Sequence, residues 1–297
     1  MYYDIHPEDM LPKRRSESHK GTYGRVLIIA GSHGMAGAAF LAGLSAYRSG
    51  CGLVEIFTHE DNRIILQELL PEAVMTTYHN ETADSLSDKL NDSLGKADAI
   101  AIGCGIGLDE TASLLLSQTC RYISVSEIPC VIDADAITLL SRRADLMSCL
   151  AGRKVVVTPH PKEMATLIHT SIDEVQEDRE QTVERFVHAA QISCLLKGYR
   201  TLVSSPDQEL YMNPSGNDGM ATGGSGDVLT GLIAGLAAQG KDICEAAVLG
   251  AYLHGAGGDY AADKMGRHSL LARDVIAGIC EIIKELEKKT NEKVQSS

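Results

Sequence analysis

Residues 217–240, NDGMATGGSGDVLTGLIAGLAAQG, place several glycines and one aspartate directly before a long apolar run. Glycine at three of these positions allows the backbone to turn its N–H groups inward, because no Cβ atom obstructs them. A helix that begins near residue 225 adds unpaired N–H groups and a partial positive charge. The sequence therefore predicts an anion hole for phosphate, formed by Gly223, Gly224, Ser225 and Gly226.

Asp227 would lie in the first turn of this helix and point into the same hole. A carboxylate there could take a proton from a hydroxyl group that attacks the phosphate. The alternative is a glycine turn followed by an aspartate that favours a helix start, but an apolar helix does not need four glycines before it. The P-loop pattern GxxxxGK[ST] is absent, and so is the dinucleotide fingerprint, which disfavours a Rossmann dehydrogenase.

Five further polar or glycine-rich motifs each follow a short apolar run that reads as a β-strand. In open α/β sheets, ligands bind in the crevice outside the carboxyl ends of the strands. Five such motifs at one edge predict a binding cleft there. The motifs cover residues 31–37, 103–107, 133–135, 158–163 and 197–201.

The elements that must position these motifs alternate along the chain. Apolar runs such as 25–30 and 52–58 are separated by segments with helical spacing, such as 36–50 and 109–123. This alternation predicts βαβ units and a parallel sheet covered by helices on both faces. After about residue 200 we expect a β-hairpin around 206–208. Three helices should follow, at about 225–239, 242–263 and 272–289.

No linker rich in Pro, Gly or Ser divides the chain, so residues 1–297 are expected to form one domain. Within it, residues 1–20 are expected to be an N-terminal arm and residues 288–297 a flexible tail. Eight cysteines lie mostly in apolar runs without a CxxC pair, and the N-terminus has no signal-peptide core. These features are typical of reduced thiols in a cytoplasmic protein.

The net charge and the lengths of the apolar stretches indicate which partners the protein can bind. The chain carries 27 Lys and Arg against 40 Asp and Glu, a net charge of −13, and no basic cluster interleaves with aromatic residues. Nucleic acid is therefore not an expected partner. The longest hydrophobic-looking stretch has 11 residues, which is too short to span a bilayer, so no membrane partner is expected. An anionic ligand must be bound by backbone amides, helix ends, a metal ion or single lysines.

The segment GMATGGSGDVLTGLIAGLAAQG resembles the signature of the ADP/ATP-dependent NAD(P)H-hydrate dehydratases of the ribokinase-like superfamily. The resemblance extends over nearly the whole chain and keeps the order of the motifs. Ser225 stands where the family usually has Thr, and Cys104 where it usually has Pro. The similar segments are 31–58, 101–107, 131–140, 155–167, 195–203 and 252–259.

The resemblance implies a ribokinase-like α/β fold with a central, mostly parallel sheet and helices on both faces. It also implies the activity. NAD(P)H hydrate would be phosphorylated on its ring hydroxyl by ADP or ATP with Mg²⁺, and loss of phosphate would restore NAD(P)H. The resemblance favours ADP as the nucleotide. It further implies a homo-oligomer and, because the frequently fused epimerase domain is missing, a separate epimerase in the same pathway.

The resemblance also assigns residues. Asp227 matches the catalytic aspartate, which would also contact the hydrate, together with Ala39, Gly105 and His160. For Ala39 and Gly105 the alternatives are helix packing and a tight turn, and for His160 a loop histidine bonded to backbone. The nucleotide would lie against the anion hole and against Lys197, Gly198, Tyr199, Arg200, Thr201 and Asn217.

Several charged residues could take part in binding Mg²⁺ or phosphate. Glu163 could help to organise Mg²⁺ and its water, or could simply be a favourable charge at a helix start. One of Asp133 and Asp135 could support Mg²⁺ through water, although capping the helix that follows is the expected role. Lys197 could neutralise a phosphate, or could be a surface lysine at a turn.

Two rival functions share these features. A ribokinase-like kinase, for example of a thiamine-precursor alcohol, would keep the anion hole and Asp227 but release a phosphorylated product. A non-catalytic nucleotide sensor would keep the cleft, but simple binding does not call for a carboxylate beside phosphate. The motifs at 31–43 and 219–224 favour the dehydratase.

Overall fold

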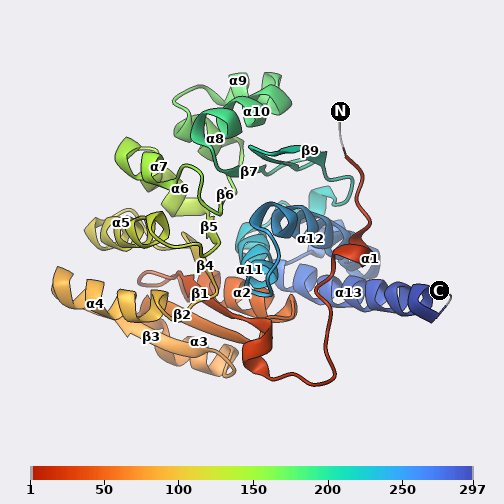
Figure 1. Cartoon of the computed structure of the whole chain (residues 1–297), viewed down its shortest axis with the longest axis horizontal. Helices are drawn as coiled ribbons and strands as arrows, with labels where there is room; N and C mark the ends of the chain where they lie inside the picture. The colour runs from red at the N-terminus through yellow and green to blue at the C-terminus, as the bar shows by residue number, and fades with distance from the viewer. Residues whose placement is uncertain (1–2, 296–297) are drawn as a thin grey trace.

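The computed structural model describes residues 3–295, in which nine strands form one sheet in the order β3-β2-β1-β4-β5-β6-β7-β8-β9 (Figure 1). Strands β1 to β7 pair in parallel with one another. Strand β8 pairs antiparallel with β7, and β8 and β9 form an antiparallel hairpin at one edge. This confirms the predicted mostly parallel sheet and the predicted hairpin. The strands are β1 (Arg25–Ile29), β2 (Leu53–His59), β3 (Val74–Tyr78), β4 (Ala99–Ile102), β5 (Cys130–Ile132), β6 (Val155–Val157), β7 (Ser193–Leu196), β8 (Leu202–Ser205) and β9 (Gln208–Met212).

The central strands are apolar on both sides, because both faces of the sheet are buried. In β1, Val26 and Ile28 contribute to one core, and Leu27 and Ile29 to the other. Successive side chains of a strand point to opposite faces, so one short run such as RVLII supplies two cores at once. The continuous apolar runs of the sequence follow from this.

Helices cover both faces of the sheet, as predicted (Figure 1). The helices packed on the Val26 face are α2 (Ala36–Arg48), α3 (Arg63–Leu69), α11 (Ser225–Ala238), α12 (Ile243–Met265) and α13 (Ala272–Gln295). Those on the Leu27 face are α4 (Ala83–Leu94), α5 (Glu110–Ser124), α6 (Ala134–Leu140), α7 (Ala144–Leu150), α8 (Pro161–Leu167), α9 (Ile172–Glu177) and α10 (Arg179–Ala190). The short 3₁₀ helices are η1 (Lys20–Tyr23), η2 (Glu60–Asn62), η3 (Asp218–Met220) and η4 (Arg267–Ser269).

Helices α2 and α11 cross closely because glycine lies at the contact. A Cβ atom added to Gly231 would lie 1.9 Å from the carbonyl oxygen of Ala42, and one added to Gly235 would lie 2.1 Å from the Ser49 hydroxyl. The apolar helix α11 is therefore in direct backbone contact with α2. This packing fixes the position of the N-terminus of α11, where the glycine motif lies.

Replacing Gly231 with alanine is expected to destabilise the protein by about 1–3 kcal/mol, because the new methyl group forces two buried helices apart. The matched control is Gly37→Ala in α2, where an added Cβ would meet no heavy atom within 4 Å. That variant should be as stable as the parent or slightly more stable. Urea unfolding of both variants measures the difference, and equal midpoints would contradict the packing described for α2 and α11.

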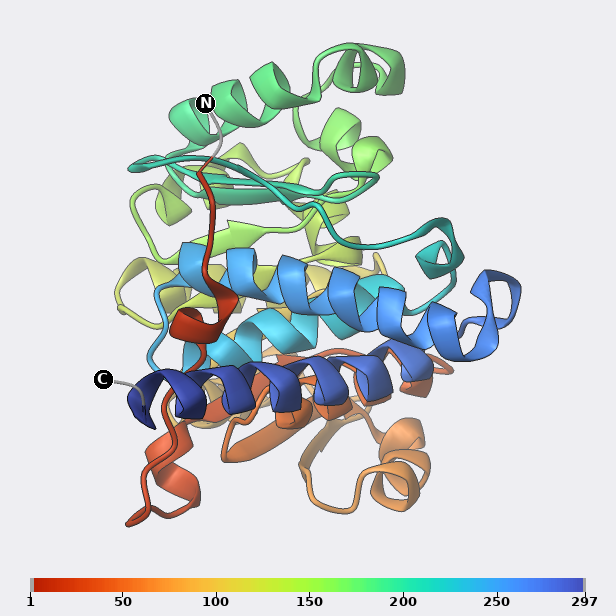
Figure 2. The same ribbon diagram turned by 90° about the vertical axis from the view of Figure 1, so that its right-hand side faces the viewer.

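The N-terminal arm docks on the C-terminal helix (Figure 2). Helix α1 (Pro7–Met10) lies beside α13, where the Thr290 hydroxyl donates to the carbonyl of Glu8 at 3.0 Å and the Lys293 ammonium pairs with the Glu8 carboxylate at 2.8 Å. Residues 288–295 belong to α13, and Thr290 and Lys293 contact α1; the flexibility predicted from residue 288 stays a prediction. Residues 1–2 and 296–297 of the predicted arm and tail lie outside the described residues.

No helix within residues 3–295 is both long and apolar enough to cross a lipid bilayer. All eight cysteines are free thiols, and six of them are buried. Burial raises the pKa of such thiols, for example that of Cys51 to about 12, which keeps them protonated.

Candidate active site

The carboxyl ends of the parallel strands lie along one edge of the sheet, so the five polar motifs are brought together as predicted. The loops after β1 and β4 are tied to each other: the amide of Gly31 donates to the Cys104 carbonyl at 3.0 Å, and that of Ser32 to the Gly105 carbonyl at 2.6 Å. Strand β2 lies on one side of β1 and strand β4 on its other side, so the order in which strands are added to the sheet reverses at β1. The loops that leave such a point run toward opposite sides of the sheet and leave a crevice between them.

The glycine motif ends at the N-terminus of α11, which begins at Ser225 as predicted. Gly224 has a left-handed backbone with φ of 88°, and a Cβ there would lie 2.3 Å from the side chain of Leu41. Gly226 has no side chain to separate its backbone from the Lys197 ammonium, which would lie 3.4 Å from an added Cβ. The unpaired N–H groups of the first helical turn therefore lie next to a cation, an arrangement suited to a phosphate group.

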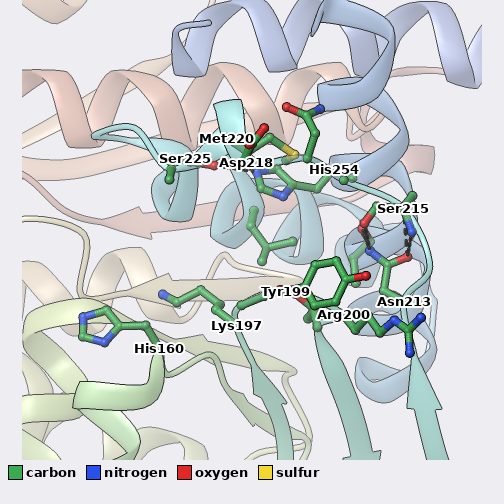
Figure 3. A pocket seen from close by; sticks show the side chains of 18 of the residues that line it. His160, Lys197, Tyr199, Arg200, Asn213, Ser215, Asp218, Met220, Ser225 and His254 are labelled. Carbon is green, nitrogen blue, oxygen red and sulfur yellow. Dashed lines mark hydrogen bonds between the residues drawn. The ribbon is translucent and has the colours of Figure 1, made fainter. Parts of the chain in front are cut away.

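A cavity of about 790 Å³ opens beside this helix terminus, between the β8–β9 hairpin, the segment 213–222 and α12 (Figure 3). Its volume is sufficient for a nucleotide-sized ligand. Nine of the residues proposed from the sequence line it: His160, Lys197, Gly198, Tyr199, Arg200, Thr201, Asn217, Ser225 and Gly226.

A buried ion pair lies at the end of the cavity that adjoins the N-terminus of α11. The Lys197 ammonium contacts the Asp133 carboxylate at 2.6 Å and the Glu163 carboxylate at 3.7 Å. The second oxygen of Asp133 accepts a hydrogen bond from the Thr230 hydroxyl at 2.7 Å, and Asp133 is only 1% exposed. Burial alone would lower the pKa of Lys197, but the two carboxylates outweigh it and hold that pKa above its usual value.

The expected capping role of Asp133 is wrong. Asp133 occupies the N-cap position of α6, but its side chain makes no capping hydrogen bond because Lys197 and Thr230 use both of its oxygens. Asp135 does not cap either and instead accepts a hydrogen bond from the Gly107 amide at 2.9 Å. Both aspartates therefore fix the site, one by holding Lys197 and the other by holding the loop after β4.

Asp227 is the third residue of α11 and lies among these groups. Burial raises the pKa of its carboxyl to about 6; the Cys104 thiol, which bonds to it, and Lys197 oppose this, whereas Asp133 and Asp135 reinforce it. A carboxyl group with this pKa is largely ionised at neutral pH and still basic enough to accept a proton. These are the properties of a general base.

His160 and Glu163 form a reciprocal cap at the start of α8. The Glu163 carboxylate accepts from the His160 amide at 2.8 Å, and Nδ1 of His160 accepts from the Glu163 amide at 3.2 Å. Since Nδ1 is an acceptor, the neutral imidazole carries its proton on Nε2. The helix-start role considered for Glu163 is present in the structure, and its role toward Mg²⁺ stays a prediction.

Six residues proposed from the sequence lie outside the lining of the cavity: Ala39, Gly105, Glu163, Gly223, Gly224 and Asp227. Ala39 is 0% exposed and faces Gly31, so its side chain serves the packing of α2. Gly105 has φ of 62°, and a Cβ there would press on Met35 and Ala38 at 3.0–3.2 Å. Their proposed contact with the hydrate therefore stays a prediction, and Gly105 is needed for its turn in any case.

Sequence reasoning missed His254, which lines the cavity from α12 (Figure 3). Its Nε2 lies 3.2 Å from the Ser225 hydroxyl, and burial lowers its pKa to about 4, so the imidazole is neutral at physiological pH. The same helix supplies Asp259, which accepts from the side chain of Asn217 at 2.8 Å and from the amide of Gly216 at 2.8 Å. Both residues belong to YLHGAGGD, one of the segments similar to the family, in which the residue types alone indicate no role.

Comparison with known proteins agrees with this geometry. A family model described as NAD(P)H-hydrate dehydratase matches residues 26–281. A bifunctional NAD(P)H-hydrate repair enzyme of Moorella thermoacetica is 40% identical over 94% of this chain, which spans 53% of that relative. The chain thus spans about half the length of the bifunctional relatives it matches. An ADP-dependent (S)-NAD(P)H-hydrate dehydratase of Neisseria meningitidis is 39% identical, covering 89% of this chain and 85% of that protein.

Among solved structures, the ADP/ATP-dependent NAD(P)H-hydrate dehydratase of Bacillus subtilis, co-crystallised with ATP and Mg²⁺, aligns with a TM-score of 0.79 at 33% identity. The alignment covers 95% of this chain and 96% of that one. It confirms the predicted ribokinase-like fold. Since the family model spans most of the chain and the motifs occur in the expected places, this chain belongs to the NAD(P)H-hydrate dehydratase family.

Proposed function

We propose that this chain is an ADP/ATP-dependent NAD(P)H-hydrate dehydratase that restores NAD(P)H from its hydrate. The observation that supports this best is the position of Asp227. Its carboxyl group, with a pKa of about 6, lies in the first turn of α11 and within the electrostatic influence of Lys197, and its neighbour Gly226 lines a cavity large enough for a nucleotide. A phosphate-binding helix terminus, a base and a nucleotide-sized cavity thus lie next to one another.

In the proposed reaction the nucleotide occupies the cavity with its terminal phosphate at the N–H groups of α11. The ring hydroxyl of the hydrate attacks that phosphorus, its proton passes to the Asp227 carboxylate, and AMP leaves when ADP is used, or ADP when ATP is used. The lone pair of the ring nitrogen then expels the phosphate, and loss of a proton from the neighbouring ring carbon completes the double bond. Positioning and charge stabilisation supply most of the rate in such transfers.

Lys197 would neutralise charge on the migrating phosphoryl group, because its ammonium lies against the backbone of Gly226. The Asp133 carboxylate and the Thr230 hydroxyl hold this lysine in place. His254 would orient the Ser225 hydroxyl at the helix start. Asn217 is fixed by Asp259 at the wall where the base or ribose would lie.

The residues at the phosphate end suit Mg²⁺, because carboxylate oxygens and nucleotide phosphates are the donors that this ion prefers. Glu163 would hold it through water, because its oxygens already serve the cap of α8 and face Lys197. When bound, the ion would neutralise charge on the phosphates.

The partners belong to the same proposal. The small-molecule substrate is NAD(P)H hydrate. A separate epimerase would act in the same pathway, a homo-oligomer is the proposed assembly, and the whole chain is proposed to act as one domain.

The test is to incubate the protein with NADH hydrate, Mg²⁺ and either ADP or ATP, and to follow the absorbance of restored dihydronicotinamide. The proposal expects recovery that requires the nucleotide and yields one phosphate per NADH. Accumulation of a phosphorylated acceptor without restored NADH would indicate a kinase instead. No recovery with either nucleotide rejects the dehydratase.

The pH dependence of this reaction is a further prediction. Because the ionised form of Asp227 accepts the proton, kcat/KM should fall about tenfold per unit below about pH 6 and reach a plateau above it. Asp227 binds its proton more tightly in the folded than in the unfolded chain. Its contribution to the free energy of unfolding therefore rises as pH falls from about 6 towards 3.8. Urea unfolding at each pH separates the change in stability from the change in kcat/KM. A kcat/KM that stays constant down to about pH 5 would contradict the role of Asp227 as the base.

A further inference from the structure

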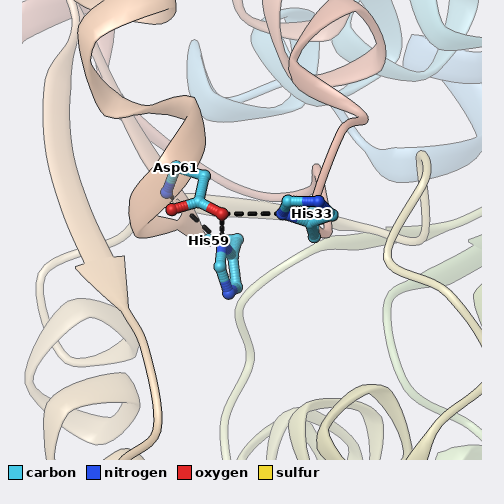
Figure 4. Close-up of side chains that lie close together, drawn as sticks. All are labelled: His33, His59 and Asp61. Atoms are coloured by element: carbon cyan, nitrogen blue, oxygen red, sulfur yellow. Dashed lines mark hydrogen bonds and ion pairs between the residues drawn. The ribbon is translucent and has the colours of Figure 1, made fainter.

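A second cluster of polar side chains lies at the same sheet edge, away from the anion hole, at the ends of β1 and β2 (Figure 4). His33 belongs to the loop after β1, His59 is the last residue of β2, and Asp61 lies in η2. The proposed reaction uses none of the three. We propose that His33, His59 and Asp61 form a binding site for a divalent transition-metal ion of the Zn²⁺ type.

The distances between the donor atoms support this site. Nδ1 of His33 lies 2.6 Å and Nδ1 of His59 lies 3.6 Å from the same carboxylate oxygen of Asp61, and all three donor atoms lie within 4.8 Å of one another. Ligand atoms around a tetrahedral Zn²⁺ ion are about 3.3 Å apart. The two observed distances lie on either side of this value. Side-chain rotations would bring all three atoms around one ion, and Nδ1 of His59 would then exchange the hydrogen bond that it accepts from the Asp61 amide at 3.3 Å for a bond to the metal.

The backbone that carries these ligands is fixed in advance. Asn62 is 1% exposed, and its side-chain amide donates to the carbonyls of Gly31 and Ser32, each at 2.9 Å. The Thr58 hydroxyl donates to the Gly31 carbonyl at 2.8 Å, as does the His59 amide at 3.1 Å. The two loops that hold the ligands are therefore tied together by buried hydrogen bonds, which is the support that a metal site requires.

The donor set indicates the class of ion. Two imidazole nitrogens and one carboxylate oxygen suit Zn²⁺, whereas Mg²⁺ and Ca²⁺ prefer oxygen donors alone. His33 and Asp61 are 79% and 51% exposed, so an ion can enter from solvent and keep water as its remaining ligand. Nδ1 of a third histidine, His79, lies 3.5 Å from Nε2 of His59 and can orient that ring.

Asp61 also differs from the acids of the other cluster with metal-ligand spacing, His6, Glu8 and Asp9. In that cluster a cation is already present, since the Lys293 ammonium pairs with Glu8 at 2.8 Å and with Asp9 at 3.1 Å. The ion pairs seen for Asp61 among residues 3–295 are with the two histidines. The second cluster therefore provides a matched control.

The test is calorimetric titration of zinc chloride into the full-length protein after removal of metal with a chelator. We expect the wild-type protein to bind one ion that His33→Gln and Asp61→Asn bind at least about 100-fold more weakly, because each lacks a direct ligand. His6→Gln should bind as the wild type does. Equal melting temperatures of all four proteins in chelator would show that the variants fold.

Identical isotherms for the wild type and His33→Gln would overturn the proposal and leave the cluster as a hydrogen-bonded loop contact. A variant that fails to fold does not remove the test, because anomalous diffraction from zinc-soaked wild-type crystals locates the ion directly. A peak between the three side chains supports the site, and zinc found only elsewhere overturns it. Neither measurement depends on the dehydratase activity.

Discussion

Replacing Asp227 with asparagine is expected to slow nucleotide-dependent recovery of NADH by about 10²–10⁴-fold, because the amide cannot accept the proton of the ring hydroxyl. The substitution keeps the shape of the side chain, so the phosphate site should stay intact. The nucleotide should therefore bind about as well as before, and the loss should appear in kcat. Steady-state kinetics with NADH hydrate, together with calorimetric titration of the nucleotide, measures both quantities.

The stability of this variant provides an internal check. Burial of the Asp227 carboxylate is unfavourable, as its raised pKa indicates, so Asp227→Asn should melt at the same temperature as the parent or higher at neutral pH. Asp263→Asn, an exposed position of α12 outside the cavity, is the matched control and should keep full activity. Undiminished recovery in Asp227→Asn would remove the proposed base.

Replacing Lys197 with methionine is expected to destabilise the protein by about 3–5 kcal/mol, because the carboxylate of Asp133 would be left buried without its cation. Methionine has a similar length and adds no charge, so the effect reports the loss of the ion pair. Urea unfolding measures it. Lys162→Met is the matched control, an exposed lysine on α8 that should unfold at the parent midpoint.

A double-mutant cycle separates the ion pair from general packing. Asn at position 133 still accepts a hydrogen bond from Thr230 but carries no charge, so Asp133→Asn should recover much of the stability lost in Lys197→Met. Additive effects of the two substitutions would show that the lysine and the aspartate do not stabilise one another. Both single variants should also lose nucleotide-dependent activity, since Lys197 faces the backbone of Gly226.

Much of the fold could be predicted because its signals are local. Apolar runs with β-branched residues became β1, β2 and β4 to β7, and helical spacing at 36–50 and 225–239 became α2 and α11. Strand β3 was missed, because it lies at the sheet edge, is partly exposed and contains two threonines, so it lacks the apolar pattern of a central strand. The contact of α1 with Thr290 and Lys293 was not predicted, because a charged sequence does not reveal which segment packs on it.

In the site, too, local features could be predicted and contacts between distant residues could not. Glycine at 224 and 226 and aspartate at 227 follow one another in the chain, so their common place at a helix start could be predicted from residue types alone. The partners of Asp133 could not, because Lys197 and Thr230 are 64 and 97 residues away in sequence. A capping role was the natural local reading of an aspartate before a helix, and two distant side chains displaced it.

By itself, the sequence determined the alternation of strands and helices, the glycine turn and the carboxylate that follows it, because each depends on backbone preferences over a few neighbouring residues. Only the tertiary structure decided which charges surround that carboxylate, that His254 lines the cavity and that His33, His59 and Asp61 meet. The physical reason is that burial and Coulomb interactions depend on distance in space, which chain order does not specify.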